Sequence, residues 1–202
     1  VEEGDQEPDP DAALGRGDPP AMKITIYSWS TNPVVLDGAE WKAYFRNFKR
    51  SAFRLEVHQV YTMPAEDETF RSFLAGESKP DRFNETWHQT IRGNASSGRT
   101  MTRAKLVRRP LTDYSRYLFG WAIPGNVEAG EDYRIVDVTE REVDLPNQDF
   151  WMFDESTVVH LNYRPDGTQV NRELIESPDI SQYLAWRDLA LESSVPFSGH
   201  RT

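Results

Sequence analysis

Polar side chains able to do chemistry are concentrated between Arg108 and Asp154, where they are interleaved with aromatic residues. A second, smaller group lies upstream, on a segment of alternating polarity. The candidate binding residues of the two groups are Arg54, Glu56, Asp113, Tyr114, Arg116, Glu131, Asp132 and Arg134. They complete no catalytic or metal-ligand spacing. We therefore predict a site that binds rather than one that catalyses, with no metal and no cofactor.

Arg54 and Glu56 stand two residues apart in the segment 53–61, whose alternation predicts a β-strand. Residues two apart on a strand share a face, so these two side chains are expected to be neighbours. A carboxylate held beside an arginine stays ionised, and it can accept a proton or bind a cationic group. The alternative is a structural salt bridge across the sheet.

Asp113, Tyr114 and Arg116 follow Pro110, which restricts the approach of the chain. An aspartate and an arginine this close can anchor a ligand or a peptide, with a tyrosine ring stacked on it. The alternative is that Thr112 or Asp113 caps a helix while Arg116 is solvated.

Glu131, Asp132 and Arg134 follow Gly130 at the start of a predicted strand. Adjacent carboxylates can hold a divalent metal, as they do in hydrolases and nucleases. Such a site needs further carboxylates that converge in space. We favour instead an ion pair between Glu131 or Asp132 and an arginine from the basic first half of the chain.

The segment 149–154, DFWMFD, is apolar on both faces of a strand. A strand of this kind is normally central in its sheet and buried. The alternative is a ligand groove lined by tryptophan.

Composition excludes several classes of site and location. The chain has no cysteine, so it has no disulfide and no thiolate ligand, and this usage fits the cytoplasmic location that we expect. Its four histidines are scattered, and it has no Walker loop, dinucleotide-binding glycine pattern or nucleophile elbow. No apolar run approaches the ~20 residues that span a bilayer, so no membrane partner is expected.

Charge is divided unevenly along the chain, although the whole carries −10. Residues 42–116 hold fifteen Lys and Arg against eight acids, whereas residues 117–202 hold six against sixteen. If they share a face, the basic residues of the first half, Arg103 and Lys105 included, would form a basic patch. With a pI near 4.9 and no recognition motif, we expect that patch to meet an acidic protein, and no sequence-specific nucleic acid.

Periodicity and turn signals predict an α+β fold: a single domain with helices packed on a central antiparallel sheet of about five strands. Helices are expected at 37–52, 64–75, 83–96 and 178–191. Strands are expected at 23–29, 53–61, 100–109, 133–138, 149–154, 157–163 and 168–176. Residues 111–121 fit either a helix or a strand.

Residues 1–21 carry seven acids, one arginine and four prolines, a composition that predicts a disordered acidic leader before a folded domain over 22–202. The chain opens on Val1, and Met22 precedes an apolar run. A start codon assigned too far upstream would give this pattern, and so would a genuine acidic tail.

Six segments in order carry a family resemblance. They are RSAFRLE (50–56), FLAGE (73–77), PLTDYSR (110–116), NVEAGEDYR (126–134), LPNQDFWMF (145–153) and WRDLALESSVP (186–196). Over roughly 38–198 the chain resembles an actinobacterial domain family of unknown function, typical of Streptomyces and often encoded beside helix-turn-helix regulators. The resemblance implies a cytoplasmic regulatory context and assigns no catalytic residue.

Three hypotheses for function follow. The first is an accessory protein of a transcriptional regulatory cassette that acts by binding a protein, plausibly a helix-turn-helix regulator. The second is a phosphate-directed hydrolase or nucleotide-processing enzyme that uses Asp113, Glu131 and Asp132. The third is a small-ligand sensor with a closed aromatic pocket near Trp121 and Trp151.

Overall fold

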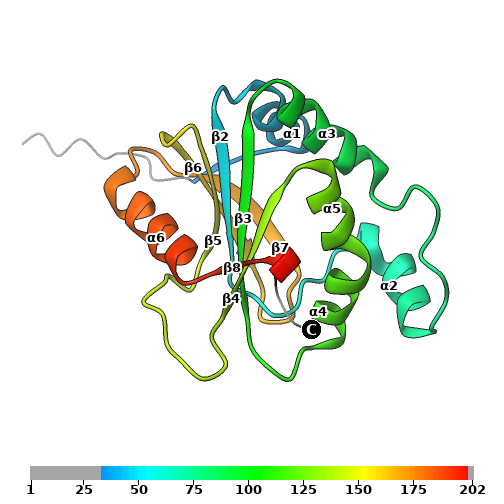
Figure 1. Cartoon of the computed structure of the whole chain (residues 1–202). Helices are drawn as coiled ribbons and strands as arrows, with labels where there is room; N and C mark the ends of the chain where they lie inside the picture. Colours follow the sequence, from blue (N-terminus) through cyan, green and yellow to red (C-terminus); the bar gives the residue numbers. More distant parts are fainter. Residues whose placement is uncertain (1–32, 200–202) are drawn as a thin grey trace, which may run out of the picture. The chain divides into compact units, whose positions relative to one another are not determined.

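A single mixed sheet forms the centre of the domain in the computed structural model, which describes residues 33–199 (Figure 1). Its strand order is β1-β7-β6-β5-β2-β3-β4-β8. The strands are β1 (Val34–Val35), β2 (Ser51–Glu56), β3 (Thr100–Val107), β4 (Asp132–Asp137), β5 (Asp149–Phe153), β6 (Thr157–Tyr163), β7 (Gln169–Leu174) and β8 (Val195–Pro196). The expected leader and the strand predicted at 23–29 lie outside the described residues.

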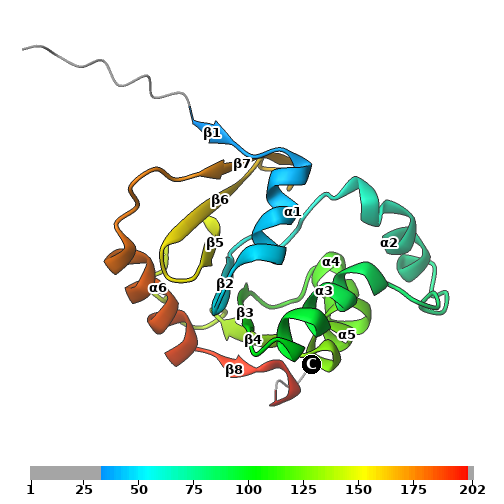
Figure 2. The same cartoon turned by 90° about the horizontal axis from the view of Figure 1, so that it is seen from above.

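Helices cover both faces of this sheet (Figures 1 and 2). One face carries α6 (Ile180–Glu192), and the other carries the remaining α-helices. Those are α1 (Gly38–Asn47), α2 (Asp67–Leu74), α3 (Glu85–Ser96), α4 (Asp113–Tyr117) and α5 (Ile123–Ala129). Shorter helical turns are η1 (Pro64–Glu66), η2 (Leu118–Ala122) and η3 (Phe197–Gly199).

The expectation of about five antiparallel strands is wrong in number and, for two of the seven strand pairings, in direction. The sheet has eight strands, and β2, β3 and β4 run parallel to one another. Parallel neighbours need a long crossover, and here α3 supplies one and the α4–α5 segment supplies the other. The edge strands β1 and β8 are two residues each, too short to show an alternation.

Most predicted elements are confirmed, and the errors lie at their boundaries. Asp37 caps α1 through a capping box with Glu40. The helix ends at Asn47 rather than at residue 52, so β2 starts two residues earlier than predicted. The late hairpin β6–β7 and the last helix lie where the turn and periodicity signals placed them.

The segment that fitted a helix or a strand, 111–121, is helical and continues through η2 into α5. Thr112 caps it by accepting a hydrogen bond from the backbone of Ser115. The turn η2 is π-helical. Pro124 follows it and has no N–H to donate to the preceding turn, which favours this wider winding.

Each face of the sheet has its own apolar core. Under α1 and α3 the buried side chains include Phe45, Ile91, Trp151 and Phe153. Under α6 they include Leu55, Phe150, Tyr183 and Ala190. The helix α1 therefore packs an aromatic residue, Phe45, into the first core, and α6 packs Tyr183 and Ala190 into the second.

Between residues 33 and 199, no helix is both long enough and apolar enough to cross a membrane.

Replacing Gly125 with alanine tests the close contact between α3 and α5. A Cβ at this position would lie 2.6 Å from Cε1 of the buried His88. We expect Gly125→Ala to lower the free energy of unfolding by about 1–3 kcal/mol through overpacking. Gly93→Ala on α3 is the matched control, because nothing lies within 4 Å of its Cβ. It should stabilise by about 0.5–1 kcal/mol. Urea denaturation that shows both variants stabilised would contradict the contact.

Candidate functional site

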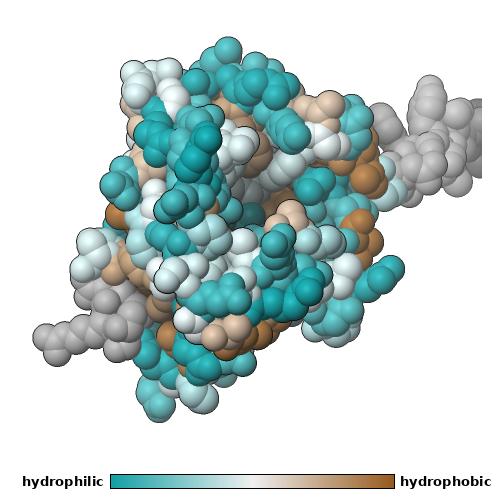
Figure 3. Space-filling view, turned by 90° about the vertical axis from the view of Figure 1, so that its right-hand side faces the viewer, coloured by the Kyte–Doolittle hydropathy of each residue, from teal (hydrophilic) through white to brown (hydrophobic). Residues whose placement is uncertain are grey.

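A cavity of about 290 Å³ lies on the sheet face that α1, α3 and α5 cover. Figure 3 shows this side of the molecule hollowed near its middle. The cavity has a floor of Arg54, Glu56, Arg103, Tyr133, Trp151 and Leu161 from β2–β6. Its walls include Trp41 and Phe45 of α1, Trp87 of α3, Glu66 of η1, Tyr114 of α4 and Asn126 of α5.

Strand register aligns four of the floor residues in one row. Trp151 is opposite Arg54 in the β5–β2 pair, and Arg54 is opposite Arg103 in the β2–β3 pair. Arg103 is in turn opposite Tyr133 of β4. Side chains in register point to the same face, so the row places two guanidinium groups between two aromatic rings. The Arg103 guanidinium lies 5.5 Å from the Trp151 ring and 5.4 Å from the Tyr133 ring.

Both floor arginines are neutralised by buried carboxylates. Arg103 donates to Glu56 over 2.6 Å and to Glu131 over 2.9 and 3.0 Å. Arg54 lies 3.0 Å from Glu56 and 3.4 Å from Asp149. Lys105, fully buried, lies 3.8 Å from Glu56 and donates to the backbone carbonyl of His58. We call these six side chains the buried charge network; its three cations and three carboxylates cancel.

The network controls the protonation of its own members. Burial alone would raise the pKa of Glu56, but Arg54, Arg103 and Lys105 outweigh it and hold that pKa below its usual range. Burial lowers the pKa of Lys105, against the opposing effect of Glu56 and Asp149. The floor therefore carries an ionised carboxylate at neutral pH.

Tyrosines complete the hydrogen bonding of the network. Tyr133 donates to Glu56 over 2.9 Å, and Tyr61 donates to Asp149 over 2.7 Å. Burial, followed by the neighbouring carboxylates, raises the pKa of both hydroxyls. Both tyrosines consequently stay neutral donors, and they help to hold the floor in one arrangement.

Besides Nε of Arg54, which lies 3.0 Å from Glu56 in an ion pair, two buried polar atoms of the cavity lining have no hydrogen-bond partner in the described part of the chain. They are Nε1 of Trp151, 1% exposed, and Oδ1 of Asn126, 6% exposed. Asn126 donates from Nδ2 to Glu131 over 2.9 Å, which sets the orientation of its amide. Two residues of the cavity lining thus keep one buried unused donor and one buried unused acceptor, although buried polar groups are normally paired.

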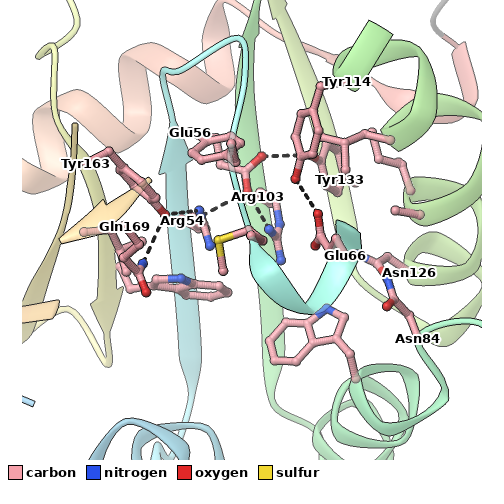
Figure 4. A pocket seen from close by; sticks show the side chains of 18 of the residues that line it. Arg54, Glu56, Glu66, Asn84, Arg103, Tyr114, Asn126, Tyr133, Tyr163 and Gln169 are labelled. Carbon is pink, nitrogen blue, oxygen red and sulfur yellow. Dashed lines mark hydrogen bonds and ion pairs between the residues drawn. The ribbon is translucent and has the colours of Figure 1, made fainter. Parts of the chain in front are cut away.

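A carboxyl group lies on the opposite wall. Glu66 accepts a hydrogen bond of 2.7 Å from Tyr114. Burial raises its pKa, against the opposing effect of the Tyr114 hydroxyl. Figure 4 shows Glu66, Asn84 and Asn126 on one side of the Arg54–Glu56–Arg103 row, with Tyr163 and Gln169 on the other.

The structure brings together four of the eight residues predicted for the site. Arg54, Glu56 and Tyr114 line the cavity, and Glu131 lies directly beneath it through Arg103 and Asn126. The alternative given for Arg54 and Glu56, a structural salt bridge across the sheet, is the one that the structure shows: the two lie 3.0 Å apart, and Glu56 also pairs with Arg103 of the neighbouring strand. The preferred pairing of Glu131 with an arginine of the basic half is also confirmed, and the partner is Arg103.

The other four candidates lie at the surface as two local pairs. Asp113 pairs with Arg116 on α4, and both side chains are more than half exposed. Asp132 lies 3.5 Å from Arg134, which also donates to Ser194. The alternative of a Thr112 helix cap is the one that the structure shows. Asp113, Glu131 and Asp132 therefore have separate partners, and between residues 33 and 199 no three His, Asp or Glu side chains are grouped as metal ligands.

The expectation that Arg103 and Lys105 could contribute to an exposed basic patch is wrong. Arg103 is 9% exposed and Lys105 is 0% exposed. Sequence reasoning also left Asn126 and Tyr133 out of the site. For Arg103 and Lys105, the sequence did hold a signal of burial: they are charged residues at alternate positions of a strand with apolar neighbours. A strand that is joined to its neighbour by a helical crossover is normally covered on both faces, so such charges are buried.

The fold and the site together define a mixed α/β domain with a cavity above a charge-balanced floor. The chain belongs to DUF6879, a family described as a domain of unknown function, whose model matches residues 39–202. A search of curated proteins found no match. Among solved structures, the chain is similar to a phospholipase D family member, Nuc, from Salmonella typhimurium. That likeness has 10% identity and a TM-score of 0.43, and it covers 81% of this chain and 91% of the other.

Removing one carboxylate of the buried charge network should destabilise the domain strongly. Glu56→Gln leaves three buried cations facing two carboxylates, and breaking such a pair costs about 3–5 kcal/mol. The matched control is Asp113→Asn, which breaks the exposed pair with Arg116 and should cost about 0.2–1 kcal/mol. Urea denaturation gives both values, and similar losses for the two variants would show that the network does not hold the floor.

The contribution of Glu56 should depend on pH in a defined direction. Because its pKa is lowered on folding, Glu56 contributes stability above its unfolded pKa of about 4.3, and this is lost as pH falls toward the folded pKa. We expect the difference in unfolding free energy between the wild type and Glu56→Gln to shrink from about pH 5 to about pH 2. Urea midpoints across that range measure it, and a constant difference would contradict an ionised Glu56.

Proposed function

We propose that this domain binds a small organic molecule in the cavity over β2 and β3, as a ligand sensor. The observation that carries the proposal is the pair of unpartnered buried atoms, Trp151 Nε1 and Asn126 Oδ1. Leaving a buried donor or acceptor without a partner costs about 1–3 kcal/mol. A ligand with matching groups relieves that cost, whereas an apolar cavity needs no such groups.

The lining supports a ligand with an aromatic or flat body. Trp41, Phe45 and Trp87 form one wall, and Trp151 lies in the floor beneath them. Ring centroids of Trp87 and Trp151 are 6.4 Å apart, and those of Trp41 and Trp151 are 6.5 Å apart. Ligand pockets are typically apolar and aromatic with a few placed polar groups, and this cavity has that composition.

Size and rigidity also favour a small ligand. The volume of about 290 Å³ is at the low end of the range for ligand pockets, which suits a metabolite rather than a peptide or a dinucleotide. The floor arginines are already held by Glu56 and Glu131. A preformed floor reduces the ordering cost of binding.

A regulatory role is proposed on other grounds, namely the resemblance to an actinobacterial family encoded beside helix-turn-helix regulators. In that context the domain would be a cytoplasmic accessory protein that transmits ligand binding to a protein partner. The exposed pair Asp113–Arg116 and the exposed side chain of Asp132, which pairs with the half-buried Arg134, are accessible to such a partner. The hydrolase hypothesis has less support, because its three carboxylates do not share a site.

Indole N–H signals of the full-length protein test the proposal directly. The probes are indole, benzimidazole, adenine, uracil, benzoate and 4-aminobenzoate, each added during two-dimensional ¹H–¹⁵N NMR. We expect at least one to shift the indole signals of Trp41, Trp87 and Trp151 together. Trp186 is the internal control, because it contacts Phe150 on the face that α6 covers.

Trp151→Phe keeps an aromatic ring and removes the donor. It should weaken the best probe about 2- to 10-fold, the effect of one hydrogen bond, whereas Trp186→Phe should not. Probes that shift Trp186 as much as Trp151, or none of the four signals, would refute a ligand site in this cavity.

A further inference from the structure

We infer that the ligand of this cavity is a small flat carboxylic acid, with its carboxylate on Arg172 and an N–H donor at its opposite end. This inference rests on the proposed function and adds the chemical class of the ligand. It depends on which charged groups of the cavity remain without partners once the buried charge network is complete.

Arg172 of β7 is the unpaired cation of the cavity. Its side chain lines the cavity and lies 5.6 Å from the ring of Trp41, and it is half-buried. Arg54 and Arg103 each contact carboxylates, but no carboxylate between residues 33 and 199 pairs with Arg172. Burial, followed by the nearby charge of Arg54, lowers the pKa of Arg172 against the opposing effect of Tyr163. A ligand anion would compensate the effect of burial.

The surroundings of Arg172 fit a carboxylate better than a phosphate. A carboxylate carries one charge and can bind a guanidinium through two parallel hydrogen bonds. A phosphate group carries more charge and is usually held by several cations or backbone donors. Gln169 donates to the hydroxyl of Tyr163 over 3.3 Å, and both groups are neutral. Arg54 donates to the same hydroxyl over 3.4 Å, but its charge is already balanced by Glu56 and Asp149, so Arg172 is left as the cation for a singly charged group.

The far side of the cavity presents acceptors instead. Asn126 offers its unpartnered Oδ1, and the carboxyl group of Glu66 has no cation partner among the described residues. Figure 4 places both across the Arg54–Glu56–Arg103 row from Gln169. A ligand that spans the cavity therefore meets a cation at one end and acceptors at the other. An amino or amide N–H satisfies the second end.

The middle of the cavity sets the shape of the ligand body. The rings of Trp41 and Trp87 pack edge-on against Trp151 and give the cavity an aromatic wall, against which a flat ligand body can lie. The charges of the floor cancel, so the body need not carry charge. An aminoaryl carboxylic acid has this combination of ends and body, and 4-aminobenzoate is its smallest probe.

The experiment is a calorimetric titration of the full-length protein at constant ionic strength. The probes are 4-aminobenzoate, benzoate, aniline and inorganic phosphate. We expect 4-aminobenzoate to bind about 2- to 10-fold more tightly than benzoate, because it adds one hydrogen bond. Aniline should bind more weakly than either acid, and phosphate should not displace them.

Two arginine variants decide the role of the anion. Arg172→Gln should weaken 4-aminobenzoate and benzoate about tenfold and leave aniline unchanged. Arg164→Gln is the matched control, because Arg164 is an exposed arginine at the end of the same hairpin and outside the cavity. It should change nothing.

Several outcomes would overturn the inference: aniline binding as tightly as 4-aminobenzoate, phosphate displacing the acids, or Arg172→Gln leaving the acids unaffected. Failure of both acids at millimolar concentration would also overturn it. If indole or benzimidazole still shifts the Trp151 signal, only the ligand class is wrong and the sensor function stands. If no probe shifts that signal, both proposals fail.

Discussion

The salt bridges of Arg103 with Glu56 and Glu131 are the interaction on which the rest of this structure depends. Arg103 lies on β3, Glu56 on the neighbouring β2, and Glu131 at the junction of α5 with β4. Removing ions from water costs several kcal/mol each, so each of these charges is tolerable only with its partners in place. The ion pairs therefore require the parallel register of β2 and β3, and they require α5 to end where it does. Gly130, with φ of 109°, ends α5 and directs Glu131 inward.

The same network leaves the cavity with a preformed floor. Because its charges and tyrosine hydroxyls satisfy one another, the floor needs no ligand to be stable, and its side chains are already ordered. A few polar groups of the cavity lining remain without a partner of their own in this network. They are the indole N–H of Trp151, the amide oxygen of Asn126, and the two charged side chains Arg172 and Glu66. In the function that we propose, recognition would depend on these groups, which the fold does not use for itself.

Membership of a domain family of unknown function places no reaction on this chain. The structure nevertheless shows where the segments that carried the family resemblance lie in the fold. Three of the six segments that carried the resemblance supply residues that meet at the floor of the cavity. These residues are Arg54 and Glu56, Asn126 and Glu131, and Asp149 and Trp151. The six segments also contain the surface pairs Asp113–Arg116, from residues 110–116, and Asp132–Arg134, from residues 126–134. Both pairs lie outside the cavity.

Local chemistry in the sequence by itself determined most of the elements. Asp37 caps a helix, DFWMFD is a central buried strand, and the turn at Gly167 joins a hairpin, because each of these depends on neighbours within a few residues. The sequence also determined that Arg54 and Glu56 share a face. Only the tertiary structure decided that Arg103 meets Glu56 from 47 positions away and that Lys105 is buried. Periodicity tells which residues share a face of a strand, but not which strand lies beside it or what covers that face; those are settled by crossovers and packing between distant segments.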